Sequence, residues 1–136
     1  MEKVLYEKKD RVALITLNRP AKMNAIDRYM NQRMDLIWND FNNDKDIWVA
    51  ILTGSGDNFC AGFDIEALTN ELGNGPYQWR RSSMFGDYRI SPNEKGVIKP
   101  VITAVSGMVN GAGVWLMLGG DIRIAAEKTK IGLGEA

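Results

Sequence analysis

Asn58-Phe59-Cys60-Ala61-Gly62-Phe63-Asp64-Ile65 is the stretch that decides the fold, together with the segment from Lys99-Pro100 to Asp121. In each of them a strand-like run ends in small residues and a helix is expected to begin. Such a junction leaves backbone N–H groups without partners inside the helix, and the helix dipole adds partial positive charge there. Two junctions that converge would stabilise an oxyanion, so the pattern favours chemistry on a carbonyl group, above all that of a thioester.

Composition and charge exclude several classes of function. The 17 basic and 17 acidic residues leave no net charge, so neither nucleic acid nor an anionic membrane surface is expected as a partner. The chain has no histidine and one cysteine, Cys60, which excludes Cys–His metal sites, intrachain disulfides and histidine-dependent triads. No apolar run is long enough to cross a bilayer, and a lone thiol fits a reducing compartment. We therefore expect a cytoplasmic protein with no metal site and no membrane contact.

The hydrophobic pattern predicts strands that alternate with helices, and hence an α/β layered fold with mostly parallel strands. The apolar run at 48–53 is nearly continuous, which is typical of a strand covered on both faces. A segment rich in glycine and proline, residues 70–98, is expected to be mobile with a broken helix, and residues 131–136 read as a loop. The predicted strands are 4–8, 12–17, 48–53, 101–105 and 122–125.

Helix signals occupy the intervals between these strands. Asp27 is a predicted N-cap, and Asn42-Asn43-Asp44 ends the helix that follows it. Further helices are expected after Asp64 and at residues 111–113. The spacing predicts one apolar face on the first helix, formed by Tyr29, Met30, Met34, Ile37, Trp38 and Phe41.

The motifs resemble the crotonase superfamily, the enoyl-CoA hydratase/isomerase group, along essentially the whole chain. Leu17-Asn18-Arg19-Pro20 with Asn24-Ala25 resembles the loop after the second strand of that family, and residues 59–65 resemble its first oxyanion motif. Residues 99–107, 111–113 and 121–125 resemble the second. Because family members are about twice this long, the resemblance implies that residues 1–136 form the N-terminal core of a ββα-type crotonase fold. The C-terminal helical part that covers the active site and builds trimers would then be absent.

The resemblance implies an acyl-CoA thioester as substrate and no other cofactor. By position, the N–H groups of Ala61 and Ala112 would bind the thioester oxygen, and one such donor is typically worth roughly 3–4 kcal/mol. For Lys22 taken alone, a solvated loop side chain is the simpler interpretation. Asp64 is expected to cap a helix rather than to take part in chemistry. The positions that match the adenine and pantetheine groove are Lys22, Met23, Ala25, Gly62, Phe63, Asp64 and Ile65.

The acid–base groups depart from the family pattern. A hydratase of this family uses two glutamates, and the first position is occupied here by Trp115, whose indole donates one hydrogen bond and has no proton to exchange near neutral pH. The second corresponds to Glu135. In an apolar thioester pocket its pKa would be raised, as proton shuttling requires. One carboxylate opposite a tryptophan favours double-bond isomerisation over hydration, unless Glu66, Asp87 or Glu94 supplies a second acid–base group.

Three interpretations remain open on this pattern. The first is an enoyl-CoA hydratase or isomerase that stabilises a thioester enolate, in which Trp115 either lies in the core or shapes the site for a bulky or cyclic acyl group. The second is a non-catalytic acyl-CoA-binding or assembly module. The third is another reaction through the same enolate, such as thioester hydrolysis, decarboxylation or ring opening. Uncovered apolar faces on the last helix and strands are expected to need a complementary chain segment or a homo-oligomer, and the resemblance implies a trimer or a dimer of trimers for the full-length protein.

Overall fold

The computed structural model describes residues 1–72 and 89–133, with the side chains of residues 71 and 72 left aside. Most of the segment predicted to be mobile, and Glu135, therefore lie outside the described residues. The strands are β1 (Val4–Lys9), β2 (Val12–Leu17), β3 (Val49–Gly54), β4 (Val101–Val105), β5 (Met108–Asn110), β6 (Ile122–Ala125) and β7 (Lys130–Gly132). The helices are α1 (Arg28–Asn43), α2 (Ile65–Leu72) and α5 (Ala112–Leu118), with short 3-10 turns η1 (Pro20–Lys22) and η2 (Asn93–Lys95).

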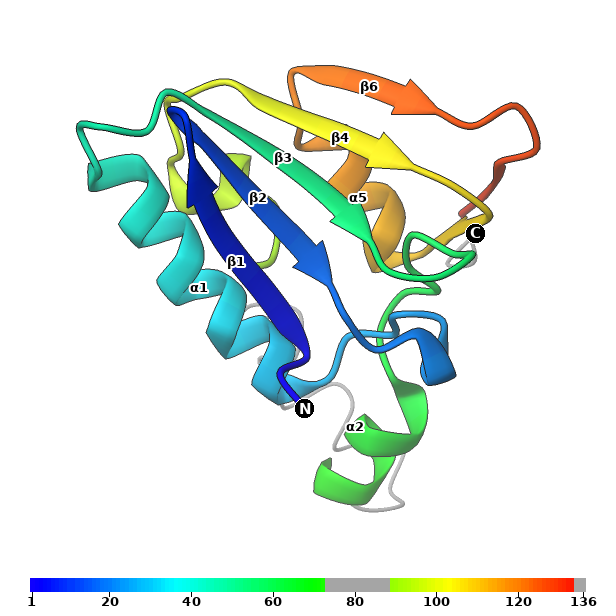
Figure 1. Cartoon of the computed structure of the whole chain (residues 1–136). Coiled ribbons are helices and arrows are strands. Elements are labelled where there is room, and N and C mark those ends of the chain that lie inside the picture. Colours follow the sequence, from blue (N-terminus) through cyan, green and yellow to red (C-terminus); the bar gives the residue numbers. More distant parts are fainter. Residues whose placement is uncertain (73–88, 134–136) are drawn as a thin grey trace.

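The main sheet has five strands in the order β1-β2-β3-β4-β6 (Figure 1). β1 and β2 form an antiparallel hairpin, and every later neighbour is parallel, so the predicted α/β fold with mostly parallel strands is confirmed. β5 and β7 form a separate two-stranded parallel sheet. In parallel strands the carboxyl ends meet at one edge, which brings the turns after β3 and β4 close together.

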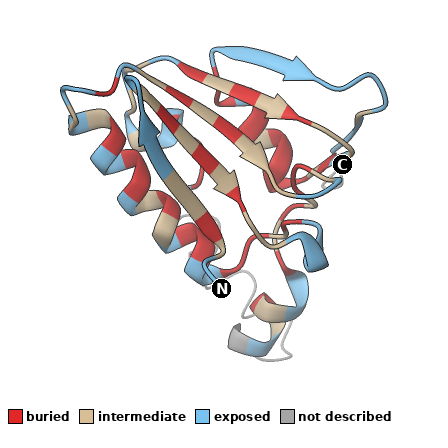
Figure 2. Cartoon of the chain, viewed as in Figure 1, coloured by how far each residue is buried: buried red, intermediate tan, exposed pale blue. Residues whose placement is uncertain are grey.

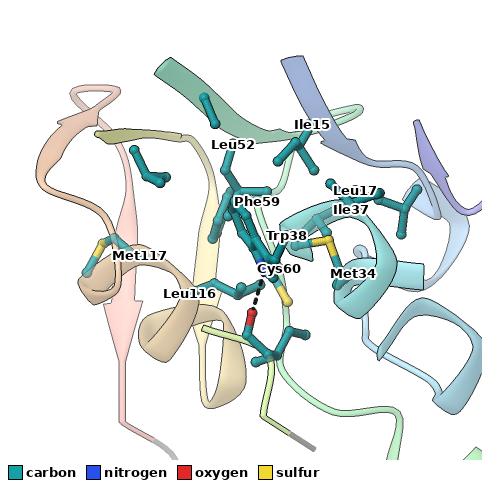
Figure 3. Packing of buried hydrophobic residues seen from close by; sticks show 14 of the residues in the cluster. Ile15, Leu17, Met34, Ile37, Trp38, Leu52, Phe59, Cys60, Leu116 and Met117 are labelled. Atoms are coloured by element: carbon teal, nitrogen blue, oxygen red, sulfur yellow. Dashed lines mark hydrogen bonds between the residues drawn. The ribbon is translucent and has the colours of Figure 1, made fainter. Parts of the chain in front are cut away.

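The helix α1 supplies much of the core. As predicted, the Asp27 side chain caps it by accepting a hydrogen bond from the Met30 N–H, at 2.9 Å. Figure 3 shows Ile15 and Leu17 of β2 directed toward the helix, while the Trp38 indole N–H donates to the Ile90 carbonyl at 3.0 Å. The helix residues that are fully buried are Met30, Met34, Ile37, Trp38 and Phe41.

Three expectations about exposure and strands are wrong. Tyr29 lies outside the core, where its hydroxyl donates to the Glu2 carboxylate at 2.8 Å. β3 is buried on alternate residues only, because its buried side chains face the same way as those of β2 and β4, toward the helices. Residues 131 and 132 belong to β7, a strand too short to carry an apolar pattern in the sequence.

The strand β6 is exposed along its whole length, as its pale blue colour in Figure 2 shows. Ile122 and Ile124 are 56% and 59% exposed, and Leu118, Ile131 and Leu133 are exposed as well. The expected uncovered apolar surface on the last helix and strands is therefore confirmed for the described residues. Such a cluster of exposed aliphatic side chains is typical of a surface that another segment or chain covers.

Candidate active site

The first turn after β3 is held by backbone pairing with β5. The Cys60 N–H donates to the Met108 carbonyl at 3.1 Å, and the Asn110 N–H donates to the Cys60 carbonyl at 2.9 Å. Cys60 is buried, which raises the pKa of its thiol to about 12, so it is a neutral core side chain rather than a nucleophile. The turn is thus a fixed part of the scaffold.

The second turn begins α5 directly against the first. Gly111 has a φ of +48°, a conformation that favours glycine. At Gly113 an added Cβ would lie 2.6 Å from the Cys60 carbonyl oxygen, so only glycine lets the helix approach this closely. Ala112 is the first residue of α5, and its N–H therefore has no acceptor within the helix.

Gly62 brings the two turns together. Its φ is +104°, and an added Cβ would lie 3.2 Å from the Asn110 carbonyl oxygen and 3.6 Å from the Ala112 nitrogen. A side chain at this position would stand against the Ala112 N–H. Because glycine has none, the two turns can approach each other closely here. The predicted convergence of the two motifs is therefore present in the structure.

The predicted role of Ala61 does not fit this geometry. Its N–H donates to the Met23 carbonyl at 2.9 Å, so it is engaged in holding the neighbouring loop. In the bridge between Ile26 and Phe63, the Ile26 N–H donates to the Gly62 carbonyl and the Asp64 N–H donates to the Ile26 carbonyl. Successive groups of an extended backbone point in opposite directions, so the Phe63 N–H points away from the Ile26 segment. The sequence alone does not show which of these backbone N–H groups points toward the neighbouring loop and which points away from it.

Two polar residues that the sequence analysis left unassigned fix the loop after β2. Asn24 is buried with a φ of +55°, and its side-chain amide donates to the carbonyls of Ser55 and Asn58 at 3.0 and 2.7 Å. Arg19 pairs with the Asp64 carboxylate at 2.6 Å and donates to the Ala25 carbonyl at 3.0 Å. The signal in the sequence was an asparagine in a turn, because asparagine tolerates the left-handed backbone that the structure shows at Asn24.

Asp64 acts as the expected helix cap. One carboxylate oxygen accepts the Ala67 N–H at 3.0 Å, while the other pairs with Arg19. Burial opposes ionisation here, but the Ala67 hydrogen bond and the Arg19 guanidinium outweigh it and hold the pKa of Asp64 below its usual value. Asp64 therefore positions the loops through Arg19 and the cap of α2, and its contact with CoA stays a prediction.

The other residues predicted to line a CoA groove lie on two loops that run side by side. Lys22 and Met23 are exposed on one loop, and Ile65 is exposed at the start of α2. The Lys22 ammonium pairs with Glu66 at 2.8 Å, on the surface. Ala25 is half-buried beside them. The structure therefore brings these residues together, next to the Gly62 turn.

Trp115 lies one helical turn beyond Ala112. Its ring meets that of Phe63 edge to face, with centroids 6.2 Å apart. It also lines a cavity of about 360 Å³ with Ser91, Asn93, Glu94, Leu118 and Gly119. Of the three carboxylates considered as a second acid–base group, Glu94 shares this cavity, Glu66 is paired with Lys22, and Asp87 lies outside the described residues.

Glu135 also lies outside the described residues, but the chain that leads to it is placed. The Gly111 N–H donates to the Gly132 carbonyl at 3.3 Å, beside the start of α5. Among the described residues no group of His, Cys, Asp and Glu side chains is arranged to hold a metal ion. Within residues 1–72 and 89–133 no helix is both long and apolar enough to span a membrane.

The fold and the two adjoining turns define an α/β protein of crotonase type. A sequence model of the enoyl-CoA hydratase/isomerase family matches residues 7–136, and the chain belongs to this family. The resemblance expected from the motifs is thereby confirmed.

Individual relatives agree with this assignment. The chain is 38% identical over 134 residues to an enoyl-CoA hydratase of Mycobacterium tuberculosis, covering 97% of this chain and 49% of that protein. It is 35% identical over 131 residues to a 1,2-epoxyphenylacetyl-CoA isomerase of Escherichia coli, covering 96% and 50%. A crystal structure of an enoyl-CoA hydratase/carnithine racemase from Magnetospirillum magneticum matches with a TM-score of 0.85 at 30% identity, over 97% of this chain and 49% of that one. The chain thus spans about half the length of these relatives.

Proposed function

We propose that this chain binds an acyl-CoA thioester and stabilises its enolate in a reaction of the hydratase/isomerase type. The observation that carries the proposal is the close approach of the Gly62 turn to the start of α5, where the Ala112 N–H has no acceptor within its helix. We assign Ala112 as one donor to the thioester oxygen and, from the direction of its backbone, the Phe63 N–H as the other in place of Ala61. Negative charge that develops on the oxygen would meet fixed amides at no reorganisation cost.

Glu135 is the proposed base. It follows Gly132, which lies beside the start of α5, by three positions, and three extended residues span at most about 10 Å. In isomerisation the carboxylate would take a proton from the carbon next to the thioester and return it two carbons away, with the electrons held on the thioester oxygen meanwhile. Trp115 offers no second carboxylate, which favours this one-base reaction over hydration.

The groove for CoA is assigned to the two adjacent loops. Met23 and Ile65 expose apolar side chains suited to pantetheine, and Ala25 lies beside them. Lys22 is within reach of an anionic phosphate once its surface pair with Glu66 opens. A flexible ammonium can change partners in this way at little cost, because exposed ion pairs contribute about 1 kcal/mol or less.

An oligomeric state and a cellular compartment are also proposed for the whole protein. The exposed aliphatic residues of β6 support a homo-oligomer, a trimer or a dimer of trimers in the whole protein. A single buried thiol is compatible with the reducing cytoplasm. That residues 1–136 are the N-terminal core of a longer enzyme stays a prediction.

Mass spectrometry of the products tests the reaction. The protein is mixed with 2-enoyl-CoA and 3-enoyl-CoA in heavy water, and the masses of the recovered esters are compared. An isomerised or deuterated ester without added water supports one-base enolate chemistry, whereas a hydrated ester requires a second acid–base group. Bound ester without any product would favour the alternative that Trp115 raises, a binding module that has lost the chemistry.

A further inference from the structure

The cavity beside Trp115 is not needed to bind CoA or the thioester oxygen. It is an open hollow of about 360 Å³ between the second half of α5 and the loop of η2. Gly119 lets α5 pack closely against this loop on one side of the cavity, since an added Cβ there would lie 2.2 Å from the Ser91 hydroxyl oxygen. The cavity is thus a built feature of the contact between α5 and this loop.

Trp115 connects the cavity to the proposed carbonyl site. Its ring contacts Phe63 and also lines the cavity, so the same side chain borders both. From Ala112 to Leu118 the helix rises by about 9 Å, a distance that an extended acyl chain of about eight carbons covers. An acyl group whose carbonyl lies at Ala112 and whose chain runs along α5 would place its distal end at the cavity.

The two sides of the cavity differ in chemistry. Trp115 and Leu118 supply an apolar wall, while Asn93 and Glu94 supply polar groups from η2. One Glu94 carboxylate oxygen accepts the Ser91 N–H at 3.1 Å, which holds the side chain at the cavity. A carboxylate has room for further hydrogen bonds beyond this one, and it accepts them without donating.

We propose that this cavity is the subsite for the distal end of the acyl group, and that Glu94 selects acyl groups whose far end donates a hydrogen bond, such as a terminal hydroxyl. The inference rests on the proposed function and deepens it. An apolar chain would lie along Trp115 and Leu118, and its hydroxyl would meet Glu94. A hydrogen bond to a charged acceptor corresponds to about tenfold in affinity or more.

Calorimetric titration with octanoyl-CoA and 8-hydroxyoctanoyl-CoA tests the proposal. We expect the protein to bind the hydroxylated ester about tenfold more tightly. Glu94→Leu should abolish or reverse this preference, and Glu94→Gln, which keeps an acceptor for Ser91, should reduce it. Glu7→Leu, an exposed change on β1 at the other edge of the sheet, is the matched control and should leave the preference unchanged.

The outcomes distinguish a failure of the role of Glu94 from a failure of acyl-CoA binding. Equal affinity for both esters in the unchanged protein, or a preference that survives Glu94→Leu, overturns the role of Glu94 while acyl-CoA binding stands. If neither ester binds, the proposed function fails and the inference fails with it. Circular dichroism verifies that the variants are folded, and if Glu94→Leu is not, an unchanged preference in Glu94→Gln overturns the proposal.

Discussion

Replacing Gly62 by alanine is the sharpest test of the site, because the added methyl group would meet the second turn at the start of α5. The new Cβ would lie 3.2 Å from the Asn110 carbonyl oxygen and 3.6 Å from the Ala112 nitrogen. It would crowd the Ala112 N–H, which is proposed to bind the thioester oxygen. Losing one such donor costs roughly 3–4 kcal/mol in the transition state, which is about a 10²- to 10³-fold loss in kcat.

The same change also strains the backbone, so its effect on stability has to be separated from its effect on activity. At a φ of +104° an alanine costs about 1–3 kcal/mol of folding free energy. Gly96 provides the matched control, because its φ is +66° and an added Cβ there meets nothing within 4 Å. We expect Gly62→Ala and Gly96→Ala to lower the free energy of unfolding by comparable amounts, measured by urea titration.

Only Gly62→Ala should lose turnover of enoyl-CoA in the mass-spectrometric assay. The reasoning is refuted if folded Gly62→Ala keeps turnover within a few-fold of the unchanged protein. It is equally refuted if Gly96→Ala loses as much, since strain alone would then account for the effect.

Further predictions concern the base, the loops and the exposed strand. Glu135→Gln should abolish turnover while leaving the Kd for a CoA ester unchanged in calorimetry, and unaltered turnover would remove Glu135 from the mechanism. Because the folded pKa of Asp64 lies below its usual 3.8, its contribution to stability is complete above that pH and is lost as the pH falls through the lowered value. Asp64→Asn should therefore reduce the loss of unfolding free energy that urea titration measures as the pH falls below 3.8, and an identical pH dependence would contradict the Arg19 pairing. Ile122→Lys with Ile124→Lys should reduce the mass of any assembly seen by light scattering, and association that is unaffected would exclude β6 from the interface.

Trp115 shows how a single departure from a family pattern directs the chemistry. The sequence predicted a missing carboxylate at that position, and the structure adds that the ring borders both the Phe63 turn and a cavity. Among the described carboxylates that were considered, Glu94 is the one that shares the cavity, yet it lies toward the far end of α5 from Ala112. That separation is the reason to assign it to recognition of the acyl end rather than to proton transfer.

The sequence by itself determined the strands of the main sheet, the Asp27 and Asp64 caps, the small-residue turns and the family. These features depend on local patterns, because capping residues, glycines and apolar periodicity act within a few positions of one another. The sequence predicted a β3 covered on both faces, whereas only alternate residues of this strand are buried, and it did not predict β5 and β7. Burial and the pairing of three-residue strands depend on distant segments.

Only the tertiary structure decided which backbone amides face the site. The sequence pointed to Ala61, but the pairing of residues 61–64 with the loop at 23–26 turns the Ala61 N–H toward Met23 and the Phe63 N–H away from Ile26. The cavity shared by Trp115 and Glu94 likewise joins residues from separate elements. Donor direction and cavity shape are set by the register of segments far apart in the chain, and a linear pattern holds no information on that register.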